Sequence, residues 1–289
     1  MGIEVLGPVR HRCDRSGGCC EGHMVRVTPE EEARITGLAP GLSVEDPVVD
    51  SGPDLPRVLR REGGRCVFLG PKGCRIHASH GADAKPAICR QYPLVAVRVE
   101  DAVRVGVDSG CLSAWATWQT GPKLDSPGLV VSRVPNMPEW LPIEEGILAA
   151  TRTLQVPQLV QRITGEDLNT FADGIKGRAR WGRLAERVLH ADTAGPLRVA
   201  LGGIAEWIEA PVAPLNPQAD AYVREMVRRV VWLRLAHNTP HPAAGARLAL
   251  AGAVLLSPLR DIRKFGPAYA AWTRVMRAPE VAAILLAVG

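Results

Sequence analysis

The sequence predicts an α+β protein, in which a small cysteine-rich metal-binding region with short strands precedes an all-helical C-terminal bundle. Two observations support this prediction: all seven cysteines lie between Cys13 and Cys111, and apolar residues after Ile143 recur at helical spacing. We expect a metal-binding domain over residues 1–119, a linker over 120–142 and a helical domain over 143–289. With 289 residues, of which 46% are hydrophobic and 22% charged, the chain can form two such cores.

The first predicted elements are a helix and a β-hairpin. Thr28-Pro29-Glu30-Glu31 has Thr at the N-cap, Pro at the first helical position and Glu where a capping box needs it. Valines alternate with other residues in Leu94–Val99, Glu100-Asp101 can turn the chain, and the alternation resumes in Val103–Val107. This pattern predicts two antiparallel strands joined by a tight turn.

The remaining N-terminal segments are shorter or irregular. Met24–Val27 and Cys66–Leu69 are brief β-branched runs that predict short strands. Residues 36–64 are rich in Gly, Pro and Asp and have little periodicity, so we expect a long loop there. Thr120–Pro142 has a similar composition and is the expected linker.

Residues after Ile143 have helical patterns. Thr164-x-x-Asp167 predicts a capping box, with Gly174 as a stop for the helix. Asn216-Pro217 predicts a helix start, and Ala243–Leu256 is apolar nearly all round, as expected of a central helix. The helix that starts at Asn216 carries one apolar face, formed by Tyr222, Val223, Met226, Val227, Val230 and Leu233.

The cysteines indicate a metal site. The N-terminus has no basic segment followed by an apolar one, so we expect no secretory signal and a cytoplasmic protein. In a reducing compartment disulfides are disfavoured, and an odd number of cysteines also argues against a closed disulfide framework. Cysteines confined to one third of such a chain usually bind metal. The candidate ligands are Cys13, Cys19, Cys20, Cys66, Cys74, Cys89 and Cys111.

Zinc and an iron–sulfur cluster are both compatible with these spacings. Zinc sites usually pair their ligands as C-x₂₋₄-C, and only the first group, Cys13 to Cys20, comes close to that spacing. Dispersed cysteines favour a four-iron (4Fe–4S) cluster buried between segments. Each isolated cysteine also has an alternative interpretation as a buried thiol, and this applies most to Cys111.

Three blocks of residues resemble the YkgJ-type cysteine-cluster family, whose domains are described as zinc- or iron-chelating. The blocks are Cys13 to Cys20, Cys66 to Ile76 and Pro86 to Pro93, which follow the patterns C-x-x-C-G-x-C-C, C-x-F/Y-L…C-x-I and P-x-x-C-R-x-F/Y-P. Ser16 stands where that pattern has its second cysteine. A site left short by this change could be completed by Asp, by water or by a nearby histidine, for which the candidates are His11, His23, His77 and His80.

The sequence is most similar to the flagellin lysine-N-methylase (FliB-like) branch, through Cys19-Cys20-Glu-Gly22-His-Met-Val25 and the late Cys111. This resemblance implies an iron–sulfur cluster, S-adenosylmethionine as methyl donor and a protein lysine as substrate. Arg90 and Tyr92, beside Cys89, are then candidates for contacting the cofactor, although both could instead pack the site. Catalytic residues are not indicated.

Two functional hypotheses follow from the sequence. The first is a metalloprotein that methylates lysine; the second is a non-catalytic module in which metal stabilises a protein-interaction surface. No G-x-G-x-x-G follows a predicted strand, so a Rossmann-type methylase is not indicated. The net charge of +5 comes from arginines interleaved with acids, and we expect no nucleic-acid partner. The longest apolar runs are too short to span a bilayer, and we expect no membrane partner.

Overall fold

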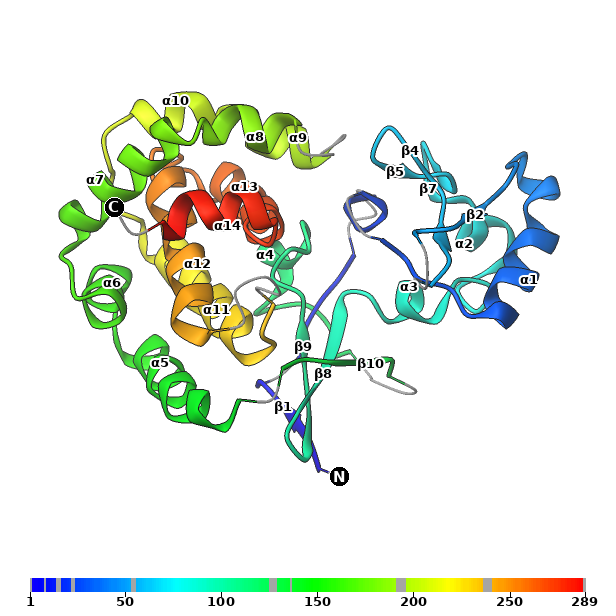
Figure 1. The fold of residues 1–289 in the computed structure, drawn as a ribbon, viewed down its shortest axis with the longest axis horizontal. Helices are drawn as coiled ribbons and strands as arrows, with labels where there is room; N and C mark the ends of the chain where they lie inside the picture. Colours follow the sequence, from blue (N-terminus) through cyan, green and yellow to red (C-terminus); the bar gives the residue numbers. More distant parts are fainter. Residues whose placement is uncertain are drawn as a thin grey trace.

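The computed structural model describes residues 2–7, 9–13, 17–21, 24–52, 56–124, 129–135, 137–190, 196–235 and 241–287. Figure 1 shows the cysteine-bearing segments (blue and cyan) on one side, the helices (green to red) on the other and a small sheet below and between them. The α+β prediction is confirmed. Among the described residues, no helix has the length and apolar character needed to cross a bilayer.

Four strands form the sheet: β1 (Gly2–Val5), β8 (Leu94–Val99), β9 (Ala102–Val107) and β10 (Val131–Arg133), in the order β1-β9-β8-β10. The central pair is the predicted hairpin, with Leu94 opposite Val107 and Glu100 at φ 50° in the turn. The edge strands β1 and β10 run parallel to their neighbours. Because β10 lies within the expected linker, part of that segment is built into the sheet.

The cysteine-bearing part contains short elements around a core of its own. They are η1 (Gly18–Cys20), α1 (Pro29–Leu38), η2 (Pro40–Leu42), β2 (Val48–Val49), β3 (Val58–Leu59), β4 (Arg61–Glu62), β5 (Arg65–Cys66), β6 (Leu69–Gly70), β7 (Gly73–Cys74), α2 (Arg75–His80) and α3 (Ala87–Gln91). The capping box at Thr28 is confirmed, with Thr28 Oγ1 and the Glu31 carboxylate each accepting from the other residue's backbone N–H.

Two sequence predictions for this part were wrong. Residues 36–64 are not one long loop, because Val44, Val48 and Leu59 are buried in a common cluster and anchor short strands there. Met24–Val27 forms no strand; it contributes only a single bridge, from Arg26 to Val58. In both places, tertiary packing outweighs a weak local pattern.

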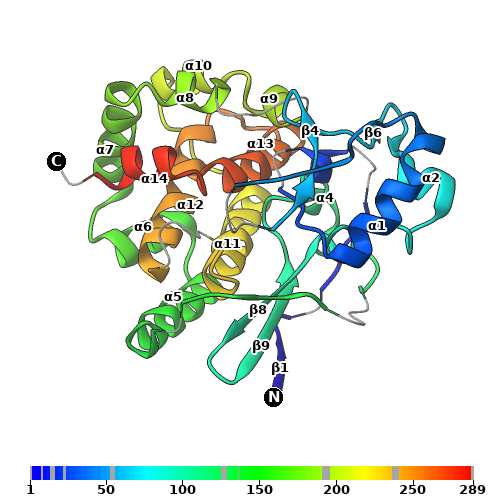
Figure 2. The ribbon, with the colours of Figure 1, turned by 45° about the vertical axis from the view of Figure 1, so that its right-hand side comes forward.

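The second half is helical, as predicted. After α4 (Ala114–Thr117) and η3 (Pro138–Trp140), it contains α5 (Leu141–Thr153), α6 (Val156–Thr164), α7 (Leu168–Trp181), α8 (Leu184–His190), α9 (Pro196–Leu201), α10 (Ile204–Glu209), α11 (Pro217–Trp232), α12 (Pro242–Leu256), α13 (Ile262–Val275) and α14 (Pro279–Leu286). Helix α12 is buried along most of its length and is central, as its composition predicted. Both views show it surrounded by other helices (Figures 1 and 2).

The predicted capping box at Thr164 was wrong. Asp167 is the N-cap of α7, and its carboxylate accepts from the backbone N–H groups of Asn169 and Thr170. Thr164 is the last residue of the preceding helix, and α7 runs through Gly174 to Trp181. The error was one of register: Asp167 caps the helix itself instead of completing a box begun at Thr164.

A buried ion-pair group joins the sheet to the helices. Arg104 of β9 and Arg234, just after α11, both donate to the carboxylate of Glu144 on α5. Glu144 is only 1% exposed, and burial raises its pKa against the opposing effect of the two guanidinium groups. Arg104 also lies over the ring of Trp232, 4.3 Å from the centroid. This ion-pair group therefore helps to fix the sheet against the bundle, together with the packing of Val97 and Val99 on Leu233 and Leu235.

Candidate metal centre

A cavity of about 1020 Å³ lies where the cysteine-bearing part meets the helical part. All seven cysteines line it, although they come from segments spread over 99 positions of the chain, Cys13 to Cys111. Residues of the helical half complete its wall, including Leu197 of α9 and Arg274 of α13. In Figures 1 and 2, α9 lies beside the cysteine-bearing strands around β4.

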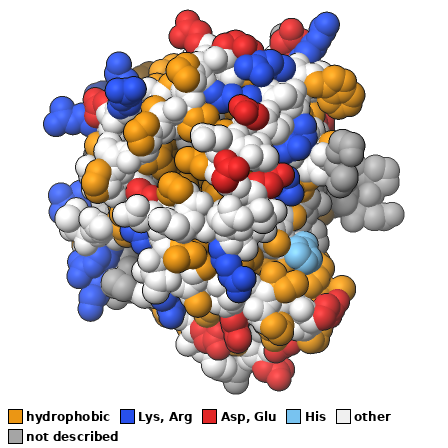
Figure 3. Space-filling view, turned by 90° about the vertical axis from the view of Figure 1, so that its left-hand side faces the viewer, with side chains coloured by type: hydrophobic (Ala, Val, Ile, Leu, Met, Phe, Trp, Pro, Cys, Tyr) orange, Lys and Arg blue, Asp and Glu red, His pale blue; other side chains and the backbone are white. Residues whose placement is uncertain are grey.

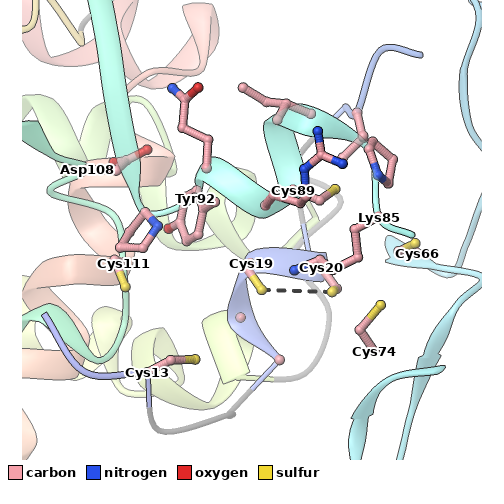
Figure 4. Close-up of a pocket in the computed structure, with 18 of the residues that line it drawn as sticks. Cys13, Cys19, Cys20, Cys66, Cys74, Lys85, Cys89, Tyr92, Asp108 and Cys111 are labelled. Carbon is pink, nitrogen blue, oxygen red and sulfur yellow. Dashed lines mark hydrogen bonds between the residues drawn. The ribbon is translucent and has the colours of Figure 1, made fainter. Parts of the chain in front are cut away.

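Four of the thiols form one group. Cys20 lies in η1, Cys66 ends β5, Cys74 ends β7 and Cys89 lies in α3. Figure 4 shows them on the same side of the cavity. Burial raises the pKa of Cys66 to about 11 and that of Cys89 to about 12, and the charges of neighbouring thiolates contribute in both cases.

The effect of neighbouring thiolates on the pKa of these thiols has a simple electrostatic cause. As thiolates, Cys20, Cys66 and Cys89 would be desolvated and would be repelled by neighbouring thiolates, so without a cation these three stay protonated. A bound metal ion reverses both effects, because it deprotonates its thiol ligands and compensates their charge. The group therefore has the chemistry of a thiolate metal site.

Cys19 and Cys20 lie next to this group at the tip of a tight turn. Gly17 precedes the turn at φ 77°, in the left-handed region that favours glycine. The two sulfur atoms are 3.8 Å apart. The hydrogen bond with Cys20 lowers the pKa of Cys19 to about 6, with help from the charges of Lys85 and Arg274. Two sulfurs on one tetrahedral zinc ion are also about 3.8 Å apart, so the spacing suits a shared metal.

The other side of the cavity carries Cys111, Cys13 and His11. Cys111 and His11 are buried, and the His11 Nε2 lies 3.9 Å from the Cys111 Sγ. Burial raises the pKa of Cys111 to about 11; Asp108 and Cys13 raise it further, against hydrogen bonds with Ser113. Cys13 is exposed and lies toward this side in Figure 4.

Helix α13 and the residues just after it hold both cysteine segments. The buried Arg274 donates to the backbone carbonyls of Gly18 and Glu21, which flank the Cys19–Cys20 turn. Arg277 pairs with Asp108, whose carboxylate also accepts from the Gly110 N–H at 2.7 Å in the loop that leads to Cys111. The C-terminal helices thus fix two segments that lie more than 160 residues earlier in the sequence.

The sequence did not indicate these positioning residues. Arg274, Arg277 and Asp108 belong to no motif, and two of them lie outside the cysteine-bearing region altogether. The only local signal was the i, i+3 spacing of the two arginines at the end of a predicted helix, which is common on solvated helix faces.

The two predicted cofactor contacts lie in different settings. Arg90 is exposed and donates to the Asp83 carbonyl at 2.8 Å, although it also borders the cavity. Tyr92 lies between Cys89 and the Asp108 side of the cavity in Figure 4. Burial raises the pKa of Tyr92 well above its usual value, and the charges of Asp108 and Cys111 add to this effect.

The other candidate histidines are exposed or lie outside the described residues. His77 is exposed but lines the cavity, whereas His80 is exposed and does not line it. His23 and Ser16 lie outside the described residues. Within the ranges that the structure describes, no three Cys, His, Asp or Glu side chains already stand at coordinating distance from one point. Metal binding must therefore draw the sulfurs closer together than they lie here.

The fold and the cavity define a metal-binding protein built around a cysteine cluster. Residues 12–111 match a protein family described as "CxxCxxCC: Putative zinc- or iron-chelating domain". The match covers the whole cysteine-bearing segment and supports zinc or iron chelation by this region. No curated protein and no solved structure matches the chain.

Proposed function

We propose that the cysteine-bearing region holds its metal, an iron–sulfur cluster or zinc, through Cys20, Cys66, Cys74 and Cys89. The observation that carries this proposal is that four thiols from four separate elements face one cavity, where the charges of neighbouring thiolates raise the pKa of Cys20, Cys66 and Cys89. Four thiolates are the usual ligand set of a 4Fe–4S cluster and of a structural zinc site. Cys19, next to Cys20, is the neighbouring thiol best placed to substitute for one of them.

Metal analysis of anaerobically purified protein tests this proposal. A cluster gives iron, acid-labile sulfide and visible colour, whereas zinc gives a colourless protein with stoichiometric metal. We expect Cys74→Ser to abolish most of the bound metal, and His80→Ala, an exposed neighbour on α2, to leave it unchanged. Full metal content in Cys74→Ser would contradict this ligand set.

We also propose that the cavity takes an organic ligand beside the metal. Its volume of about 1020 Å³ is at the upper end of the range for small-molecule sites, about 300–1,000 Å³, and exceeds the space that one metal centre needs. The FliB-like resemblance makes S-adenosylmethionine the first ligand to test and methyl transfer to a protein lysine the first reaction. A partly apolar lining next to Tyr92 and Asp108 suits a ligand with both apolar and charged parts.

The residues present constrain that chemistry. A lysine nucleophile must lose its proton, but the raised pKa of Tyr92 keeps its hydroxyl protonated, so Tyr92 can donate a hydrogen bond and is a poor base. The Asp108 carboxylate is ion-paired with Arg277, which weakens it as a proton acceptor. We therefore assign Tyr92 to ligand orientation and leave the base unassigned.

Calorimetry of the metal-loaded protein with S-adenosylmethionine decides between the two hypotheses. Binding that disappears in Cys89→Ser and is accompanied by methyl transfer supports an enzyme. If loaded protein binds no S-adenosylmethionine, the methylase hypothesis is removed, and the metal then serves as the stabilising centre of a protein-interaction module.

A further inference from the structure

We propose that His11, Cys13 and Cys111 form a second metal site, separate from the four-sulfur site, which binds one zinc-like divalent ion and keeps a coordination position open toward the cavity. This inference rests on the proposed function only in that both require the cavity to bind metal. It differs in naming a histidine ligand that lies just outside the matched family segment.

The distance between His11 and Cys111 suits a shared ion. Their Nε2 and Sγ atoms are 3.9 Å apart, and both side chains are at least nine-tenths buried at the cavity wall. On a tetrahedral zinc ion, a nitrogen at about 2.0–2.1 Å and a sulfur at about 2.3 Å are about 3.6 Å apart. A shift of a few tenths of an ångström would bring the pair to coordination geometry.

Hydrogen bonds set the tautomer of His11 that a metal needs. The Thr117 hydroxyl donates its one proton to the Ser113 carbonyl at 3.2 Å, and it accepts from the Arg12 backbone N–H at 3.2 Å. Toward His11 Nδ1, 3.5 Å away, Thr117 can then act only as an acceptor. In that arrangement the ring N–H at Nδ1 donates to Thr117, and Nε2 is the ring atom that lies 3.9 Å from the Cys111 Sγ.

This arrangement is the usual one for a metal-binding histidine. Such a ligand donates its second ring N–H to an oxygen nearby, and that contact fixes both its tautomer and its orientation. Close packing holds the backbone of His11 as well, since a Cβ on Gly121 would lie 2.9 Å from the His11 nitrogen. His11 and Thr117 are thus arranged before any metal arrives.

Cys13 supplies the third ligand. It lines the same cavity as Cys111 and lies two positions after His11 in the chain. Figure 4 shows both on the side opposite Cys66 and Cys74. Because no three ligands already meet among the described residues, Cys13 must move toward the His11–Cys111 pair when metal binds.

The donor set also indicates what the site can do. Two thiolates and one imidazole suit zinc, and three protein ligands leave a fourth position for water or a ligand, as in catalytic zinc sites. Here that position faces a cavity with room for a small molecule. The second site is therefore placed to polarise a ligand, whereas a four-thiolate site is closed.

Cobalt(II) titration of the reduced, metal-free full-length chain tests the inference, since thiolate-bound cobalt is coloured and its stoichiometry can be counted. We expect wild type to bind two ions, His11→Ala and Cys111→Ser to lose one, and Cys74→Ser to lose the other. His80→Ala is the matched control and should bind both. Thr117→Val keeps the ligands but removes the orienting oxygen, and should weaken the second site by about 10- to 100-fold.

Alkylation of Cys13, followed by peptide mapping, provides a readout that does not depend on spectra. Metal should protect Cys13 in wild type and in Cys74→Ser, but not in His11→Ala, while unchanged circular dichroism shows that each variant folds. If wild type binds no cobalt, both the second site and a zinc-type four-sulfur site are refuted, and the absence of iron and sulfide as well would refute the proposed function. If wild type binds cobalt, but His11→Ala keeps both the stoichiometry and the protection of Cys13, the second site alone is refuted.

Discussion

Arg274 offers the sharpest test of how the helical half supports the metal centre. Its guanidinium is 9% exposed and donates to the carbonyls of Gly18 and Glu21, on either side of Cys19–Cys20. A hydrogen bond from a charged donor contributes about 1.5–3 kcal/mol, and two such bonds are lost in Arg274→Met. Methionine fills similar space and removes a buried charge, which offsets part of that loss. We expect the free energy of unfolding to fall by about 2–3 kcal/mol.

In Arg274→Met, the loss of metal affinity should be larger than the loss of folding stability alone explains. Without Arg274 the turn is no longer held before binding, and loss of a group that orients ligands typically costs about 10- to 100-fold in metal affinity. Competition with a chromophoric chelator measures this, with Arg263→Met, exposed on the same helix, as the control. An affinity within twofold of wild type in a folded Arg274→Met protein would refute the reasoning.

Four further predictions concern the fold and the thiols. Glu144→Ala removes the carboxylate shared by two buried guanidinium groups and leaves Arg104 with a 3.7 Å ion pair to half-exposed Glu4. It should lower the free energy of unfolding by about 3–5 kcal/mol in urea titration, whereas exposed Glu145→Ala should change it little. Gly252→Ala places a Cβ 2.1 Å from the Trp272 indole and should lower the free energy of unfolding by about 2–3 kcal/mol. Gly146→Ala, which has open space at its Cβ, should raise the free energy of unfolding by about 0.5–1 kcal/mol. Because burial raises the pKa of Cys66, Cys89 and Cys111 above 9.0, a bound metal must displace the protons of these thiols at neutral pH. The apparent metal affinity should therefore rise with pH, by up to about tenfold per pH unit for each proton released. A metal affinity that stays constant between pH 6 and 8 would contradict this prediction. Chelation should increase hydrogen exchange in the cysteine-bearing segments before the helices, and simultaneous loss of both would show that the prediction is wrong.

Surface charge bears on the expected partners. Figure 3 shows that the helical side of the molecule carries basic and acidic side chains together, with apolar side chains between them. A nucleic-acid site is usually a patch or stripe of one sign. The absence of a nucleic-acid partner stays a prediction, which a binding assay at low salt would check.

The sequence by itself determined the elements whose signals are local. A capping box needs only four consecutive residues, so the start of α1 at Thr28 could be read directly. The β8–β9 hairpin follows from alternation around a two-residue turn, and α12 from an apolar composition that only a buried helix tolerates. The metal-binding character followed as well, because cysteines so concentrated in one region have few other uses.

Only the tertiary structure decided how the cysteines are divided and what holds them. Burial and electrostatic interaction across the cavity are properties of segments that meet in space. No local spacing encodes that Cys20 and Cys66 lie on one side of the cavity, whereas Cys13 and Cys111 lie on the other (Figure 4). The same holds for Arg274, which contacts a turn 253 to 256 positions away. In the sequence, His11 was one of four candidate histidines among the seven that the chain contains. It became the favoured ligand candidate when the fold buried it, placed its Nδ1 beside the Thr117 hydroxyl and brought its Nε2 to 3.9 Å from the Cys111 sulfur.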